Sequence, residues 1–213
     1  MYKYVAIIFD FDGVLVESVD VKTKAFALMY AAYGDDIVKK VIDYHLINGG
    51  VSRFDKFRYY EETLLGNSLD TARERALGEQ FSSLVIDAVV KAQWVPGAKE
   101  FLDDYHKKIP FFVASGTPDS EIKEIVARRD MSHYFISVHG TPAKKEEIIT
   151  LICRENCFSS DRVLMVGDAL SDYEGAKRAG VAFIARRTHN IPFPAQVVLI
   201  PDLCGLFSHV LES

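Results

Sequence analysis

Two aspartates one residue apart end the first apolar run of the chain. Val5 to Phe9 are apolar, and Asp10, Asp12 and Gly13 follow directly. Burying one unpaired carboxylate is costly, and two like charges close together also repel each other. A compensating group outside this segment is therefore expected.

Polar residues also follow three later apolar runs, each at the point where a strand would end. They are Ser115, Gly116, Thr117, Lys144, Lys145, Asp168 and Asp172. Taken singly, each short motif has a structural explanation as a turn or a helix cap. Because ligands bind beyond the carboxyl ends of parallel strands, one shared site explains all four strand ends better.

The four aspartates in this set indicate the chemistry. Asp10 and Asp12 point to the same side of an extended chain, and Asp168 and Asp172 add two more carboxylates. Like charges about 4 Å apart cost on the order of 4 kcal/mol per pair at an effective dielectric near 20. One lysine cannot balance them, whereas Mg²⁺ prefers carboxylate and water oxygens. The sequence therefore predicts a magnesium site at these aspartates.

The elements that position these residues alternate in type from residue 96 onward. Strands are expected at 109–114, 134–138, 162–166, 181–185 and 197–200, and helices at 98–105, 119–129, 146–155 and 172–179. This alternation predicts an α/β fold with a parallel sheet covered on both faces. Residues 17–93 instead show helical periodicity without a strand pattern, with helices expected near 26–33, 52–64 and 69–89.

We therefore expect two domains. Residues 1–15 and 94–213 form the α/β core, and residues 16–93 form an inserted, all-helical cap over the sheet. Within the cap, Gly49 and Gly50 precede a helix that begins near Ser52, and Arg53 lies in its first turn. Two interpretations stay open here. Either this loop faces the site and binds substrate through these residues, or Arg53 is solvated.

Composition excludes several classes of function. The 213 residues are 49% hydrophobic, enough for a substantial core, and the net charge of −5 without a long basic run argues against nucleic acid. The apolar runs are too short for a membrane span, and no secretory leader is recognisable. Three cysteines make no disulfide framework, and Cys153 and Cys157 lack further ligands for zinc. A soluble cytoplasmic protein with a small-molecule substrate is expected.

These motifs resemble the haloacid dehalogenase-like superfamily, in its phosphoglycolate phosphatase and β-phosphoglucomutase-like subgroup. The first motif, Asp-x-Asp-x-Val, corresponds to residues 10–14, the second to Ser115 and the fourth to Gly167 through Asp172. The likeness covers residues 4 to about 185 and implies a Rossmann-like core with a helical cap. The third motif is a lysine. Spacing favours Lys145, but Lys144 stays open because Glu146 stands where many relatives have proline.

The resemblance implies a Mg²⁺-dependent phosphatase acting on a small phosphate ester. Asp10 would attack phosphorus and form an aspartyl phosphate, and Asp12 would act as general acid and then as general base. Mg²⁺ would be held by Asp10, Asp168 and the backbone carbonyl of Asp12, with Asp172 either supporting these ligands from behind or acting through water. Ser115, Gly116, Thr117 and Lys145 would bind the transferring phosphoryl group.

Three alternatives follow from the same resemblance. A β-phosphoglucomutase-like phosphomutase is favoured by the segment GGVSRFDKF but not by Gly49, where those relatives have lysine. A metal-independent haloacid dehalogenase would lack Asp12. A Schiff-base phosphonatase needs a cap lysine, and the candidates Lys22, Lys24, Lys39, Lys40 and Lys56 are interpreted as lying on solvated helix faces.

Overall fold

A parallel β-sheet forms the centre of the molecule. The computed structural model describes residues 2–188 and 191–211, and within them one six-stranded sheet has the order β3-β2-β1-β4-β5-β6. The strands are β1 (Ala6–Phe9), β2 (Phe111–Pro118), β3 (Ser137–Thr141), β4 (Val163–Gly167), β5 (Ala182–Arg186) and β6 (Val198–Ile200). All neighbours are parallel, and Ile7 of β1 is in register with Phe111 and Leu164. The predicted α/β, Rossmann-like fold is confirmed.

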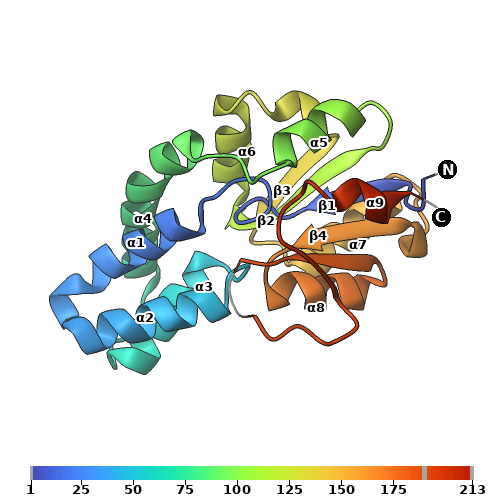
Figure 1. Cartoon of the computed structure of the whole chain (residues 1–213). Helices are drawn as coiled ribbons and strands as arrows, with labels where there is room; N and C mark the ends of the chain where they lie inside the picture. The colour runs from blue at the N-terminus through green and yellow to red at the C-terminus, as the bar shows by residue number, and fades with distance from the viewer. Residues whose placement is uncertain (1, 189–190, 212–213) are drawn as a thin grey trace.

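Helices cover both faces of this sheet (Figure 1). The side chains of β1 alternate between two apolar clusters, with Ile7 and Phe9 in one and Ala6 and Ile8 in the other. Helices α5 (Ala98–Tyr105), α6 (Asp119–Arg128) and α9 (Leu206–Val210) contribute to the first cluster. Helices α7 (Lys145–Glu155) and α8 (Leu170–Ala179) contribute to the second. Both faces of β1 are therefore dry, as its near-continuous apolar sequence requires.

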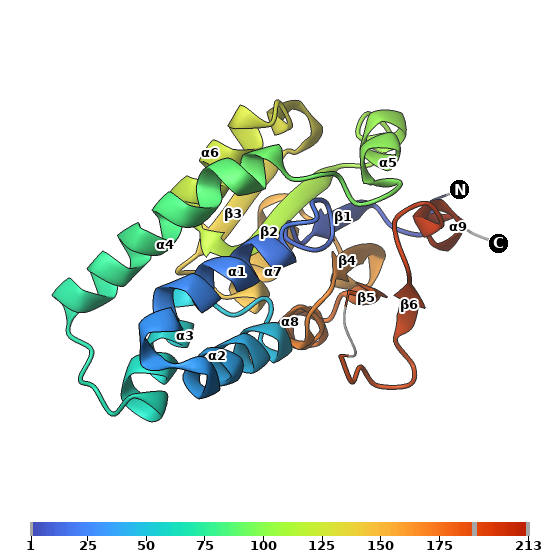
Figure 2. The ribbon, with the colours of Figure 1, turned by 60° about the vertical axis from the view of Figure 1, so that its left-hand side comes forward.

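A helical insertion lies between β1 and α5 and extends to one side of the sheet (Figure 2). Its elements are α1 (Val19–Tyr30), η1 (Ala31–Tyr33), α2 (Asp35–Ile47), α3 (Arg53–Arg58), the π-helix η2 (Tyr59–Leu64) and α4 (Thr71–Lys91). Fully buried aromatic rings from α1, α3, η2 and α4 pack together, among them Phe26, Phe57, Tyr60 and Phe81. These rings belong to the same apolar cluster as Ile7 and Phe9, so the interior of the insertion is continuous with one face of the sheet.

The chain enters and leaves this insertion through two paired segments. Val16 and Trp94 form an antiparallel bridge. The N–H of Glu17 donates to the carbonyl of Gln93 at 2.9 Å, and the N–H of Val95 donates to Leu15 at 3.0 Å. The two crossings therefore run side by side.

Some predicted boundaries are displaced. β2 begins at Phe111 rather than at 109. The N–H of Ile109 donates to the carbonyl oxygen of Tyr105 at the end of α5, so it is not available for a strand partner. β3 covers Ser137–Thr141 rather than 134–138, since Tyr134 lies in a 3₁₀ turn. Helix α2 was not individually predicted, although Ile37, Val41 and Tyr44 recur at helical spacing within residues 35–47 and pack against the apolar cluster.

Candidate active site

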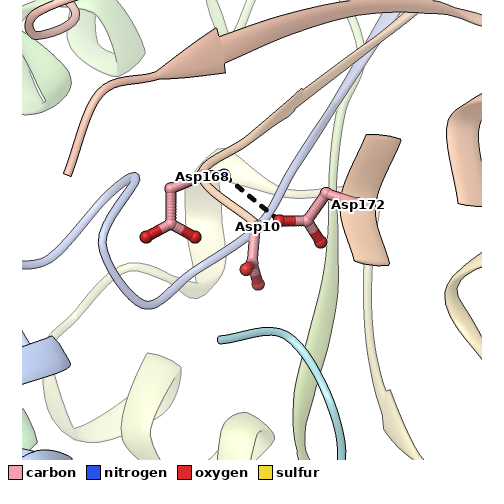
Figure 3. A group of neighbouring side chains, drawn as sticks. All are labelled: Asp10, Asp168 and Asp172. Atoms are coloured by element: carbon pink, nitrogen blue, oxygen red, sulfur yellow. Dashed lines mark hydrogen bonds between the residues drawn. The ribbon is translucent and has the colours of Figure 1, made fainter. Parts of the chain in front are cut away.

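Three carboxylates meet beyond the carboxyl ends of β1 and β4. Asp10 follows β1, Asp168 follows β4 and Asp172 lies in the first turn of α8 (Figure 3). All three are buried, and one oxygen of each lies within 4.8 Å of the others. Asp172 Oδ2 accepts hydrogen bonds from the N–H groups of Asp168 and Ala169, both at 3.1 Å. The structure thus brings together three of the four aspartates predicted to bind metal.

Lys145 is the cation inside this group. It is the first residue of α7, and its Nζ lies 2.8 Å from Asp10 Oδ1 and 2.8 Å from Asp172 Oδ1. Burial opposes its charge, but Asp10 and Asp172 together raise the pKa of Lys145 above its ordinary value. Lys144 is exposed, with its backbone N–H bonded to Glu147. Of the two lysines left open by the sequence, Lys145 is the one placed beside the carboxylates.

The carboxylate group carries more negative charge than Lys145 can offset. Burial raises the pKa of Asp10 to about 7, with further contributions from Asp172 and Asp12. Burial and the charge of Asp10 also raise the pKa of Asp168 well above its ordinary value. Three converging carboxylates suit a hard divalent cation with oxygen ligands, and the donor set therefore fits Mg²⁺.

Asp12 belongs to a different hydrogen-bond network. Its Oδ2 lies 2.5 Å from Lys22 Nζ and accepts from Thr117 Oγ1 at 3.2 Å, and its Oδ1 accepts from Ser18 Oγ at 2.6 Å. Although burial opposes ionisation, Lys22 lowers the pKa of Asp12 below its ordinary value. The Asp12 side chain lies outside the group of three. The interpretation of Lys22 as a solvated lysine is wrong, because α1 packs over the site and brings it to Asp12.

The second strand end lies in the same region. Ser115 is buried, and its Oγ accepts from the N–H of Thr117 at 3.1 Å. Gly116 and Thr117 line a cavity together with Asp10, Asp12 and Asp168. Ser115 and Lys145 line an adjoining hollow that shares Gly116 with this cavity. The predicted phosphoryl-binding residues therefore line two adjoining hollows that meet at Gly116.

The helical insertion supplies the opposite wall of the cavity. Its contributing residues are Val19, Lys22, Phe26, His45, Leu46, Gly49, Gly50, Val51, Arg53, Lys56 and Phe81. A Cβ on Gly116 would lie 2.6 Å from the carbonyl oxygen of Gly50, and one on Gly50 would lie 2.3 Å from Ser171 Oγ. The loop predicted from its two glycines therefore packs directly against the core.

Arg53 fits neither of its two interpretations completely. Only 5% of its surface is exposed, so the solvated interpretation is wrong. Its guanidinium donates to Glu121 of α6 at 2.7 and 3.1 Å and to Ser82 at 2.8 Å, and it lies over the ring of Phe81. Arg53 lines the cavity, but its charge is matched by a core carboxylate.

Lys56 is a third residue, after Lys22 and Arg53, whose solvated interpretation is wrong. It is 2% exposed and lines the cavity, with Nζ 2.9 Å from His45 Nδ1 and 3.3 Å from the carbonyl oxygen of Gly49. The sequence signal for this placement was its position one turn after Arg53, which puts both side chains on the same face of the helix. Ser18 and His45 were missed because no local pattern distinguishes them.

Comparison with known proteins identifies the family. The model of the haloacid dehalogenase-like hydrolases matches residues 4–180. The chain belongs to this hydrolase family. A curated relative of the hydrolase, the phosphorylated carbohydrates phosphatase of Thermotoga maritima, is 28% identical over 193 residues, or 87% of this chain and 86% of the relative.

Solved structures share the hydrolase fold. CbbY of Rhodobacter sphaeroides, in complex with phosphate, has a TM-score of 0.73 at 19% identity and covers 95% of this chain and 96% of its own. A predicted phosphoglycolate phosphatase of Haemophilus somnus has a TM-score of 0.76 at 17% identity, with 98% and 99% covered. Within residues 2–188 and 191–211, the hydrolase contains no helix with the length and apolar character of a membrane span.

Proposed function

We propose that this hydrolase is a Mg²⁺-dependent phosphatase of small phosphate monoesters, either phosphorylated sugars or short organic acids. One observation carries the proposal: buried Asp10 lies at the head of the sheet with Lys145 on one side and Asp12 in the same cavity. The activity of the relative from Thermotoga maritima supports phosphorylated carbohydrates as the substrate class.

Asp10 is the proposed nucleophile. Its carboxylate oxygen attacks phosphorus, the bond to the sugar oxygen breaks, and Asp12 gives a proton to that leaving oxygen. Water then attacks the aspartyl phosphate while Asp12 takes the proton, which releases phosphate and restores Asp10. The contact with Lys22 favours ionised Asp12, which is the state that the second step needs. The same contact opposes the protonated state that the first step needs.

The remaining core residues balance charge. Asp10, Asp168 and the backbone carbonyl of Asp12 would hold Mg²⁺, with Asp172 acting through a water molecule. When bound, the ion would reduce the repulsion between the nucleophile and the phosphate. Lys145, the Ser115 hydroxyl and the Gly116 N–H would neutralise the phosphoryl oxygens.

The helical insertion is proposed to act as a cap, so that residues 16–93 form one domain and the rest of the chain forms the core. Support comes from the two walls of the cavity, one from each part of the chain. A closed cap would exclude bulk water and favour transfer of the phosphoryl group to Asp10.

Phosphate release from a panel of sugar phosphates and phosphorylated organic acids tests this proposal. The purified enzyme is assayed with Mg²⁺, with excess chelator, and as the Asp10→Asn variant. Activity should require both the metal and Asp10, and intact mass should reveal a phosphate adduct only when Asp10 is present. Equal rates with metal and with chelator would contradict the proposal. Conversion of a sugar 1-phosphate to its 6-phosphate faster than phosphate release would favour the mutase.

A further inference from the structure

Lys56 is a buried cation that has no carboxylate beside it. Its side chain is almost fully covered, yet within residues 2–188 and 191–211 no carboxylate oxygen lies within 4.0 Å of its ammonium group. The other cations of the site differ in this respect. Lys22 contacts Asp12, Arg53 contacts Glu121, and Lys145 contacts two aspartates.

The groups that Lys56 does contact leave its charge uncompensated. Its Nζ lies near His45 Nδ1 and the carbonyl oxygen of Gly49, and the Phe26 ring is 5.8 Å away. An ammonium group has three N–H donors, so these two partners leave one to spare. Burial, with a smaller effect of Lys22, lowers the pKa of Lys56 to about 7 against the attraction of Asp12 and Asp168. A nearby anion would offset this burial.

The position of Lys56 determines what such an anion can be. Lys56 lines the cavity from the helical insertion, whereas Asp10 and Asp168 line it from the core. A phosphate placed at Asp10 would therefore leave the other end of the substrate on the side of the insertion. Arg53, on the same helix, already has Glu121 as its partner.

We propose that Lys56 binds an anionic group, a carboxylate or a second phosphate, at the end of the substrate remote from the phosphate that is hydrolysed. This inference rests on the proposed phosphatase function and narrows its substrates to those with two anionic ends. A hydroxyl group would satisfy a donor but would not offset the buried charge.

Matched substrate pairs test the inference directly. Glycerol 3-phosphate is compared with 3-phosphoglycerate, and glucose 6-phosphate with 6-phosphogluconate. Glucose 1,6-bisphosphate shows whether a phosphate serves in place of the carboxylate. For each pair, the ratio of kcat/KM for the anionic substrate to kcat/KM for its neutral partner is measured in wild type, Lys56→Met and Lys56→Gln. Lys40→Met is the control, because Lys40 is an exposed lysine of α2.

In wild type, the ratio should exceed one for at least one pair. Both neutral variants should lower that ratio by roughly 30-fold, as expected when one partner of a buried charge pair is removed, and Lys40→Met should leave it unchanged. Melting curves establish that each variant is folded. The inference would be overturned if wild type showed no preference for the anionic substrate of any pair. It would also be overturned if the Lys56 variants lowered kcat/KM equally for both substrates of a pair. Absence of phosphate release from every substrate would instead overturn the proposed function.

Discussion

The ammonium group of Lys22 lies 2.5 Å from Oδ2 of Asp12 and so joins the first helix of the insertion to the loop that follows β1. Thr117 Oγ1 accepts from the same ammonium at 2.8 Å. The acid–base residue proposed for the core is therefore held by a side chain of the insertion, and its ionisation depends on where α1 lies.

Lys22→Met should slow the second half of the reaction. Loss of the cation raises the pKa of Asp12, so less of the base is ionised and the aspartyl phosphate persists. We expect a fall in kcat of about 10–100-fold, within the usual range for acid–base assistance. Quenched-flow samples analysed by intact mass would show more phosphoenzyme than in wild type. Lys24→Met, at an exposed site on the same helix, is the control. An unchanged phosphoenzyme level would show that Lys22 does not assist hydrolysis of the aspartyl phosphate.

Asp168→Asn should stabilise the metal-free protein. Burial and the charge of Asp10 raise the pKa of Asp168, so its ionised form is unfavourable without a cation. At pH 8 with chelator, we expect Tm to rise by about 2–4 °C, which corresponds to roughly 1 kcal/mol in a chain of this size. Added Mg²⁺ should raise the Tm of wild type but not that of this variant.

The control for this melting experiment is Asp104→Asn, which removes an exposed aspartate of α5. It should keep the wild-type response to Mg²⁺. A response of the same size in Asp168→Asn would place the metal elsewhere.

Lys145→Ala should depress turnover severely, and Lys144→Ala should do much less. Lys145 is buried against Asp10 and Asp172, whereas Lys144 is exposed one residue earlier. Removing one group that stabilises transition-state charge typically costs about 10²–10³-fold in kcat. Steady-state phosphate release measures both variants under identical conditions. The opposite ranking would transfer the role to Lys144.

Arg53 and Glu121 should be energetically coupled. Their ion pair joins α3 of the insertion to α6 of the core and is largely buried on the arginine side. Arg53→Met and Glu121→Gln should each lower the free energy of unfolding, and the double variant should lose less than their sum. Urea denaturation gives the coupling, for which we expect about 0.5–3 kcal/mol. Additive effects would show that the contact contributes nothing to stability.

The core half of the site was largely predictable because each residue lies next to an element that the sequence specifies locally. Asp10 and Asp168 directly follow apolar strands, and Lys145 begins a helix with an apolar stripe. Strand ends in a parallel sheet meet at one edge, so local patterns sufficed to bring Asp10 and Asp168 together and to favour Lys145, while Lys144 stayed open. Asp12 was the exception, since its carboxylate is taken up by partners that include Lys22 from outside the sheet.

The insertion half was not predictable in the same way. Lys22 and Lys56 take their partners from outside their own helices: Lys22 contacts Asp12 and Thr117 of the core, and Lys56 contacts His45 and Gly49 of the insertion. The docking of the insertion against the core then places both lysines at the cavity. That docking depends on contacts distant in sequence, such as Arg53 with Glu121 and Gly50 with Gly116. A glycine pair suggests flexibility in a sequence, but here it permits two backbones to touch.

The paired crossings at Val16 and Trp94 bear on how such a chain can change over generations. Because the outgoing and returning backbones are neighbours, the order of strands in the sheet is independent of the number and length of the helices between them. Those helices can be enlarged, shortened or exchanged by a single recombination event without changing the strand order of the parallel sheet. Because Lys22 of the insertion contacts Asp12, an exchanged set of helices would keep the phosphoryl chemistry only if it again placed a cation beside Asp12.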